Sequence, residues 1–182
     1  MQRLVREIEI PEGVSVDVDG MTVTVTGPLG TLKRTFNNTG IAIEKVDNKV
    51  IVRALSHKRK AKANAGTVEA HIRNMIKGVQ KEWIYKLRVV YSHFPIKVTV
   101  KGDVVEIVNF LGAKTPRYAR IMPGAKVEIN GQDIIVRSIN KEAAGQTAAN
   151  LELATKLGPE FDPRKFQDGI YIVEKAVWGE EE

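Results

Sequence analysis

The sequence contains no cysteine, which excludes disulfide bonds, thiolate metal sites and cysteine nucleophiles. Aromatic residues make up only 6% of the 182 residues. No apolar run reaches the length that a membrane-spanning helix needs. The first ten residues carry acidic side chains within a short apolar pattern, so they do not resemble a signal peptide. We therefore expect a cytoplasmic protein without a membrane partner.

Catalytic motifs are missing as well. The three histidines, His57, His71 and His93, are scattered and lack the spacing of metal ligands. No stretch supplies a nucleophile, a base and an oxyanion donor together. We predict that the protein is not an enzyme and has no metal, no cofactor and no small-molecule substrate. A hydrolase that uses Asp17 or Asp19 is an alternative that the sequence leaves open.

The sequence does contain an internal repeat. Residues 14–30 recur 82 positions later as residues 96–112, with six of the seventeen positions identical. Residues 50–53 are similarly matched by residues 134–137. The identical pairs are Val16/Val98, Val18/Val100, Gly20/Gly102, Val23/Val105, Leu29/Leu111 and Gly30/Gly112. A repeat of this length predicts one small domain made twice, residues 1–82 and residues 83–182.

Each copy is expected to be mostly antiparallel sheet with one helix. Val14, Val16 and Val18 alternate with polar residues, which is typical of a strand with one buried face. Asp19-Gly20 and Asn130-Gly131 are hairpin turn pairs. Alternating apolar residues over 83–91 predict a further strand between the copies. The predicted fold class is therefore α+β, with two tandem duplicated domains.

The two predicted helices differ in composition. The first carries one apolar stripe, with residues spaced by three or four along the chain, and Ser56 is its expected N-cap. The stripe consists of Ala61, Ala65, Val68, Ile72, Met75 and Val79. The second helix is rich in alanine, and Asn140 is its expected N-cap. So many small residues indicate close packing of that helix on its sheet.

Basic charge points to a polyanionic partner. The net charge is +6, with a pI near 9.5. Residues 1–93 hold 16 Lys and Arg against 9 Asp and Glu, whereas residues 94–182 hold 12 against 13. The densest cluster lies at the start of the first predicted helix, where cations oppose the helix dipole unless an anion binds there. Its candidate RNA-binding residues are Lys58, Arg59, Lys60 and Lys62.

Two weaker sets lie in the second copy. One is a predicted loop between Pro116 and Pro123, in which Arg117 and Arg120 flank Tyr118, a combination suited to phosphate contact and base stacking. The other set joins the start of the second helix to the C-terminal region, and it consists of Lys141, Gln146, Arg164, Lys165 and Lys175. For all of these sets the alternative is a solvated surface.

Four stretches resemble a known family. They are residues 70–79 (AHIRNMIKGV), 91–95 (YSHFP), 139–149 (INKEAAGQTAA) and 162–171 (DPRKFQDGIY). Together they resemble the universal large-subunit ribosomal protein L-six family, called L-nine in eukaryotes. The last stretch is similar to the archaeal and eukaryotic branch. The resemblance covers residues 1–178.

The resemblance implies a structural constituent of the large ribosomal subunit that supports translation. Such a protein binds 23S-type rRNA near the base of the factor-binding stalk and the sarcin–ricin loop. Its partners would be rRNA, neighbouring ribosomal proteins and nearby translation factors. The family's main rRNA anchor lies in the second domain, which implicates Lys141, Gln146, Arg164 and Lys165. A protein–protein adaptor with duplicated domains and an incidental basic face is the alternative.

Overall fold

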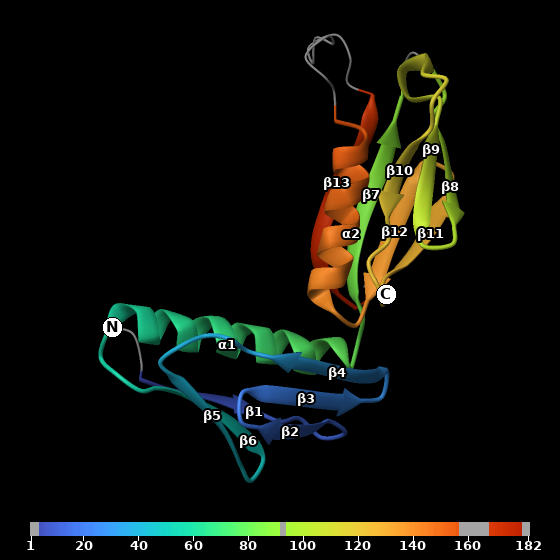
Figure 1. The fold of residues 1–182 in the computed structure, drawn as a ribbon. Helices are drawn as coiled ribbons and strands as arrows, with labels where there is room; N and C mark the ends of the chain where they lie inside the picture. The colour runs from blue at the N-terminus through green and yellow to red at the C-terminus, as the bar shows by residue number, and fades with distance from the viewer. Residues whose placement is uncertain (1–3, 92–93, 157–167, 180–182) are drawn as a thin grey trace. The chain divides into compact units, whose positions relative to one another are not determined.

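The computed structural model describes residues 4–91, 94–156 and 168–179. The chain divides between Glu82 and Trp83 into two compact units, here called the first and second repeat. Each repeat combines antiparallel sheets with one long helix (Figure 1). The predicted α+β class and the duplication are confirmed.

The first repeat contains two three-stranded sheets and helix α1. Its strands are β1 (Val5–Glu9), β2 (Ser15–Asp19), β3 (Thr22–Gly27), β4 (Gly30–Thr35), β5 (Ile41–Val46) and β6 (Lys49–Ala54), and α1 spans Arg59–Gly78. One sheet has the order β2-β3-β4 and the other the order β1-β6-β5. The predicted hairpin at Asp19-Gly20 joins β2 to β3, with Asp19 opposite Thr22.

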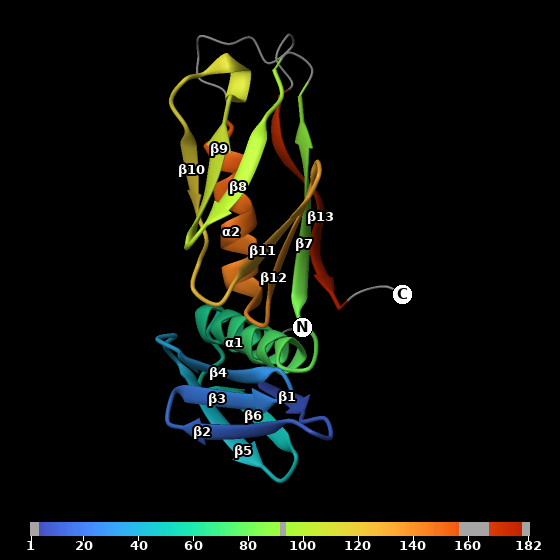
Figure 2. The ribbon, with the colours of Figure 1, turned by 90° about the vertical axis from the view of Figure 1, so that its right-hand side faces the viewer.

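The second repeat follows the same plan and adds one strand. Its strands are β7 (Trp83–Val90), β8 (Lys97–Lys101), β9 (Val104–Val108), β10 (Arg117–Arg120), β11 (Lys126–Asn130), β12 (Asp133–Ser138) and β13 (Gly169–Trp178). A 3-10 turn spans Phe110–Gly112, and α2 spans Lys141–Ala154. The sheets have the orders β10-β9-β8 and β11-β12-β7-β13. The additional strand β13 lies on β7, antiparallel to it (Figure 2).

Each repeat has its own hydrophobic core, and the two buried clusters share no residue. In the first repeat, α1 packs on both sheets, and its predicted stripe is buried from Ala61 through Met75. In the second repeat, α2 contacts β7, β10, β12 and β13 and buries mainly small side chains. The predicted close packing of α2 is confirmed at Gly145, where an added Cβ would lie 2.9 Å from the Tyr85 hydroxyl.

Candidate nucleic-acid interface

The start of α1 exposes a cluster of cations. The helix begins at Arg59, with Lys58 as its N-cap, and its first turn contains no acidic residue. Lys58, Arg59 and Lys60 are exposed, Lys62 is partly buried, and Ala61 between them faces the core. The structure therefore places the four predicted cations in one turn.

No side chain caps this helix. The prediction that Ser56 is the N-cap is wrong, because the helix begins three residues later and the Ser56 hydroxyl accepts a 3.4 Å hydrogen bond from the Lys58 amide instead. The first backbone N–H groups of a helix have no partner within the helix and carry partial positive charge. Cationic side chains around uncapped N–H groups form a surface that favours an anion, such as a phosphate.

The start of α2 has the opposite character. Asn140 is the N-cap, as predicted, and its side-chain oxygen accepts hydrogen bonds from the amides of Glu142 and Ala143. Glu142 places a carboxylate in the first turn, which complements the helix dipole. Lys141 is half-buried, and its Nζ lies 4.8 Å from the centre of the Trp83 ring. The predicted contact residue Lys141 thus has an aromatic partner within the protein.

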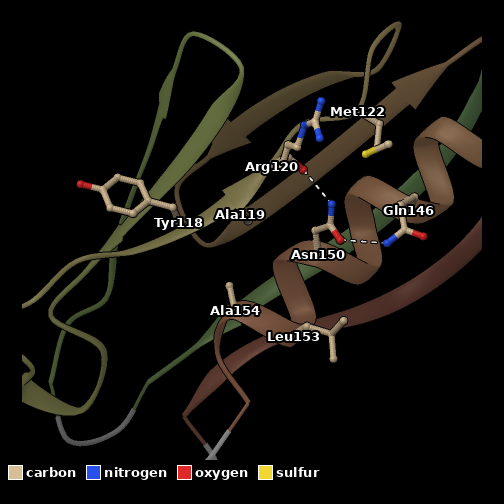
Figure 3. Close-up of a pocket in the computed structure, with 8 residues that line it drawn as sticks. All are labelled: Tyr118, Ala119, Arg120, Met122, Gln146, Asn150, Leu153 and Ala154. Atoms are coloured by element: carbon tan, nitrogen blue, oxygen red, sulfur yellow. Dashed lines mark hydrogen bonds between the residues drawn. The ribbon is translucent and has the colours of Figure 1, made fainter.

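A groove runs between β10 and α2 in the second repeat (Figure 3). Its volume is about 650 Å³. The lining includes two predicted residues, Arg120 from β10 and Gln146 from α2, which are 26 positions apart in the sequence. The prediction of a loop at 117–120 is wrong, because these residues pair with β9 as an edge strand. Packing of α2 beside β10 brings one residue of each predicted set together here.

Sequence reasoning missed Asn150, which connects the two sides of this groove. The Asn150 side-chain nitrogen donates to the Arg120 carbonyl at 3.0 Å, and its side-chain oxygen accepts from Gln146 at 2.9 Å (Figure 3). Gln146 and Asn150 are four residues apart and therefore lie on the same helix face. That spacing is the signal that would have identified Asn150.

Two large apolar side chains border the groove and face solvent. Tyr118 is 57% exposed and projects from β10 away from α2, and Leu153 on α2 is 60% exposed (Figure 3). Tyr118 therefore lies outside the core, and its neighbour Ala119 is the buried residue. An exposed aromatic ring beside Arg120 provides a stacking surface next to a cation.

Arg117 has a structural role as well. Its Nη1 donates to the carbonyls of Ala154 and Lys156, at 2.9 and 3.3 Å, at the C-terminal end of α2. The guanidinium carbon also lies 4.6 Å from the centre of the Phe110 ring. A cation at a helix C-terminus complements the helix dipole. Arg120 is thus the more accessible of the two arginines on β10.

The remaining predicted residues are not gathered into this groove. Lys175 is exposed on β13, at an irregularity between Glu174 and Val177 where the register against β7 shifts. Arg164 and Lys165 lie outside the described residues. On β8, the hydrogen bond and the charge of Glu106 raise the pKa of Lys101, whose Nζ lies 2.9 Å from the Glu106 carboxylate. Lys101 is therefore paired and serves below as a control.

Other kinds of site are not found in the part of the chain that the structure describes. No group of three or more His, Asp or Glu side chains is placed to hold a metal ion there. No helix among these residues has the length and apolar character to cross a membrane.

Comparison with known proteins identifies the family. Residues 10–82 and 94–169 both match the family model described as Ribosomal protein L6. The chain belongs to the ribosomal protein L6 family. The two matches lie in the two repeats, and this agrees with the duplication seen in the fold.

Full-length relatives support the same assignment. The chain is 52% identical over 175 residues to the large ribosomal subunit protein uL6 of Aeropyrum pernix, and the matched region covers 96% of each chain. It is 49% identical over 176 residues to the uL6 protein of Methanosarcina mazei, which covers 97% of this chain and 99% of the relative. For the uL6 protein of Methanococcus vannielii, the identity is 52% over 170 residues and 93% of each chain.

Membership in the L6 family confirms the predicted functional class, a protein of the large ribosomal subunit. The chain is a ribosomal protein and not an enzyme, so the hydrolase alternative with Asp17 or Asp19 is wrong. The resemblance of residues 162–171 to the archaeal and eukaryotic branch agrees with these archaeal relatives. The individual contact residues stay predictions.

Proposed function

We propose that the chain binds large-subunit rRNA near the base of the factor-binding stalk, close to the sarcin–ricin loop. There it would lie beside neighbouring ribosomal proteins and support the landing site of translation factors. The proposal combines the family resemblance with the cationic surfaces described above. No bond is made or broken by the protein in this role.

The observation that carries the proposal is the start of α1. Three exposed cations, Lys58, Arg59 and Lys60, surround backbone N–H groups that lack a side-chain cap. For folding alone an acidic or capping residue is preferred at this position, and its absence costs the free protein stability. A bound phosphate removes this cost by accepting from the N–H groups and neutralising the side chains.

The second repeat would supply a different kind of contact. Arg120, Gln146 and the exposed Tyr118 lie on or beside one groove, where a nucleotide can be stacked and its phosphate paired. Lys141 at the start of α2, Arg117, Arg164, Lys165 and Lys175 remain predicted contacts. Such a surface recognises the shape of folded RNA, while the lysines and arginines supply most of the affinity.

The first test measures binding of an rRNA fragment that contains the stalk base and the sarcin–ricin loop. Binding should weaken steeply with added salt, because each neutralised phosphate releases counterions. Changing Lys58, Arg59, Lys60 and Lys62 together to Gln should lower the slope of log K against log salt by roughly three, at about 0.7–0.9 per contact. The matched control changes Lys33, Lys45, Lys49 and Arg53 to Gln, and removes the same charge from the strands of the first repeat.

Equal loss of affinity in both variants would show that net charge, and not the start of α1, determines binding. In the second repeat, Arg120→Gln with Tyr118→Ala should weaken binding more than Lys97→Gln with Lys101→Gln. The same outcome in both pairs would contradict the groove assignment.

The adaptor alternative is tested separately with ribonuclease. Co-sedimentation of the chain with large subunits should survive moderate salt and be lost after ribonuclease treatment. Retention on a protein partner after the RNA has been digested would instead favour the adaptor.

A further inference from the structure

Strand β1 forms one of the sheet edges that are unpaired among the described residues of the first repeat. Strand β1 pairs with β6 on one side and is the last strand of its sheet on the other. The Leu4 carbonyl and the Ile10 amide bond toward β6. Successive residues of an antiparallel strand point their N–H and C=O groups to opposite sides of the strand. The N–H and C=O groups of Val5, Glu7 and Glu9 therefore face the outer edge.

The second repeat has a strand on the corresponding edge. Residues 50–53 on β6 correspond to residues 134–137 on β12, so the pairings Ile8–Val50 and Leu87–Ile134 make β1 equivalent to β7. Strand β7 pairs with β12 on one side and with β13 on the other. The position that β13 occupies in the second repeat has no described strand in the first.

A groove of about 400 Å³ lies along this position in the first repeat. It is lined by Val5, Arg6 and Glu7 of β1 and by Glu69 and Arg73 of α1. The strand β13 contacts both β7 and α2, so its counterpart would contact both β1 and α1. The groove is thus bounded by the two elements that a docked strand would touch.

The helix positions correspond in detail. Gly66 of α1 lies over Arg6, as Gly145 of α2 lies over Tyr85, which aligns the two helices at these glycines. Glu152 is then equivalent to Arg73. The Glu152 carboxylate accepts a 3.1 Å hydrogen bond from the Ile172 amide of β13. Arg73, which is exposed on the groove and hydrogen-bonded to Glu69 at 2.6 Å, would donate to a carbonyl of a docked strand.

Charge indicates what kind of strand fits. On β7, Lys86 lies 3.4 Å from Glu174 of β13. The strand registers make Glu7 and Glu9 of β1 equivalent to Lys86 and Arg88 of β7. Two anions of the first repeat thus occupy the positions of two cations in the second. Two exposed carboxylates repel RNA phosphates, and a second copy of this edge would bring like charges together. A strand with Lys or Arg at alternate positions complements them.

We propose that the outer edge of β1 binds an extended, basic segment of another protein, which adds to the sheet as an antiparallel strand. The main-chain groups of Val5, Glu7 and Glu9 pair with the segment, and Glu7 and Glu9 select its lysines or arginines. In taking the partner to be a neighbouring protein of the large subunit, this inference rests on the proposed function.

The edge itself is tested with the purified full chain and the synthetic peptide Lys-Val-Lys-Val-Lys-Val-Thr, by amide hydrogen exchange in NMR spectra. The peptide should slow exchange of the Val5, Glu7 and Glu9 amides and leave the Arg6 and Ile8 amides, which face β6, unchanged. A peptide with Glu in place of Lys should bind about fivefold or more weakly, since cross-strand charge pairs then become repulsive. No selective protection of the three amides would overturn the proposal.

Matched variants separate the edge from general charge. Glu7→Lys and Glu44→Lys each replace an exposed carboxylate by a cation, at the two opposite edges of the same sheet. Each carboxylate is paired with a cation of β6, Glu7 with Lys49 at 3.5 Å and Glu44 with Arg53 at 3.7 Å. Only Glu7→Lys should weaken binding of the basic peptide. Glu7→Pro removes an outward N–H without breaking the pairing with β6. It should weaken binding of both the Lys and the Glu peptide by about fivefold, because one typical hydrogen bond is lost. Equal effects of Glu7→Lys and Glu44→Lys would overturn the assignment.

The class of partner is tested within large subunits. Because the sequence has no cysteine, Val5→Cys gives a single site for a photoactivated benzophenone label. Crosslinks to a Lys- or Arg-rich protein segment support the proposal, and crosslinks only to RNA overturn it. Failure of the variant to enter subunits would contradict the proposed function, and the peptide titration would still decide whether the edge binds a strand.

Discussion

The two repeats share a fold but begin their helices in opposite ways. Helix α2 is capped by Asn140 and has Glu142 in its first turn, whereas α1 has a lysine at the N-cap and cations in its first turn. Their buried faces differ too, because α1 buries branched and long apolar side chains and α2 buries mostly alanines. The comparison teaches that duplication preserved the packing plan while the exposed positions diverged. In the second repeat the helix start is capped, and in the first it carries cations and no side-chain cap, a combination that favours an anion.

The largest expected effects come from the two cores. Ile72 and Leu151 occupy equivalent helix positions and are both fully buried, so changing either to Ala should destabilise its own repeat by about 2–5 kcal/mol. Chemical denaturation with hydrogen exchange measures this, and protection should fall in the mutated repeat. Leu153→Ala, at an exposed position on α2, is the control and should change stability by less than about 0.5 kcal/mol. Equal loss of protection in both repeats would contradict separate cores.

The next effect concerns the helix C-termini. Arg117 holds the end of α2 and stacks on Phe110. At the end of α1, the Val79 amide donates to the Met75 carbonyl and the uncharged Gln80 side chain donates to the Ile76 carbonyl. Arg117→Met should therefore cost about 1–2 kcal/mol, through the lost dipole and cation–π interactions. Urea denaturation measures the loss. If Arg117→Met left stability unchanged and weakened only RNA binding, the residue would be a contact and not a support.

The helix N-termini should respond in opposite directions. Asn140→Ala removes a side-chain cap and should cost about 1 kcal/mol. Lys58→Asn supplies a cap that α1 lacks and should stabilise the first repeat by a similar amount. The same change should weaken rRNA binding and lower its salt slope by roughly one. Thermal unfolding and filter binding on the same samples measure stability and rRNA affinity. A Lys58→Asn variant that was both more stable and bound rRNA more tightly would contradict the prediction.

The smallest effect distinguishes the helix glycines. At Gly66 an added Cβ would lie 3.4 Å from the Arg6 guanidinium, an ordinary contact, so Gly66→Ala should gain up to about 1 kcal/mol of helix propensity. At Gly145 the Tyr85 hydroxyl at 2.9 Å must move first, so Gly145→Ala should gain less or destabilise. Denaturation midpoints of the two variants compare them directly. An equal gain would mean that Tyr85 moves without cost.

Local patterns predicted much of the fold. The alternating valines of β2, the Asp19-Gly20 turn and the apolar stripe of α1 are each confirmed, because they depend on neighbours within one strand or one helical turn. Pairing over long separations was not predictable in this way. Strand β13 pairs with β7 across a long separation, from Gly169 opposite Val90 to Trp178 opposite Trp83, with register shifts after Ile172 and after Glu174. Nothing in either segment alone specifies that partner.

The candidate interface was predicted in parts and assembled only by the structure. Arg120 and Gln146 were separate predictions, and packing of α2 beside β10 places them on one groove. Two prolines suggested a loop at 117–120, but four residues suffice for an edge strand when β9 supplies the hydrogen bonds. Ser56 failed as a cap because the helix begins at Arg59, and the Ser56 hydroxyl therefore meets the Lys58 amide, which precedes the first helical residue.

The missing cap on α1 has a consequence for the life of the unassembled chain. Under the proposed function a phosphate of the rRNA takes the place of the missing cap, so the chain would gain stability on entering the ribosome, by mass action. Before assembly, we expect the first turn of α1 to open more readily than the capped first turn of α2, which would expose that segment to proteases. Surplus copies would therefore be removed faster than assembled ones, which matches the supply of the protein to the supply of its RNA.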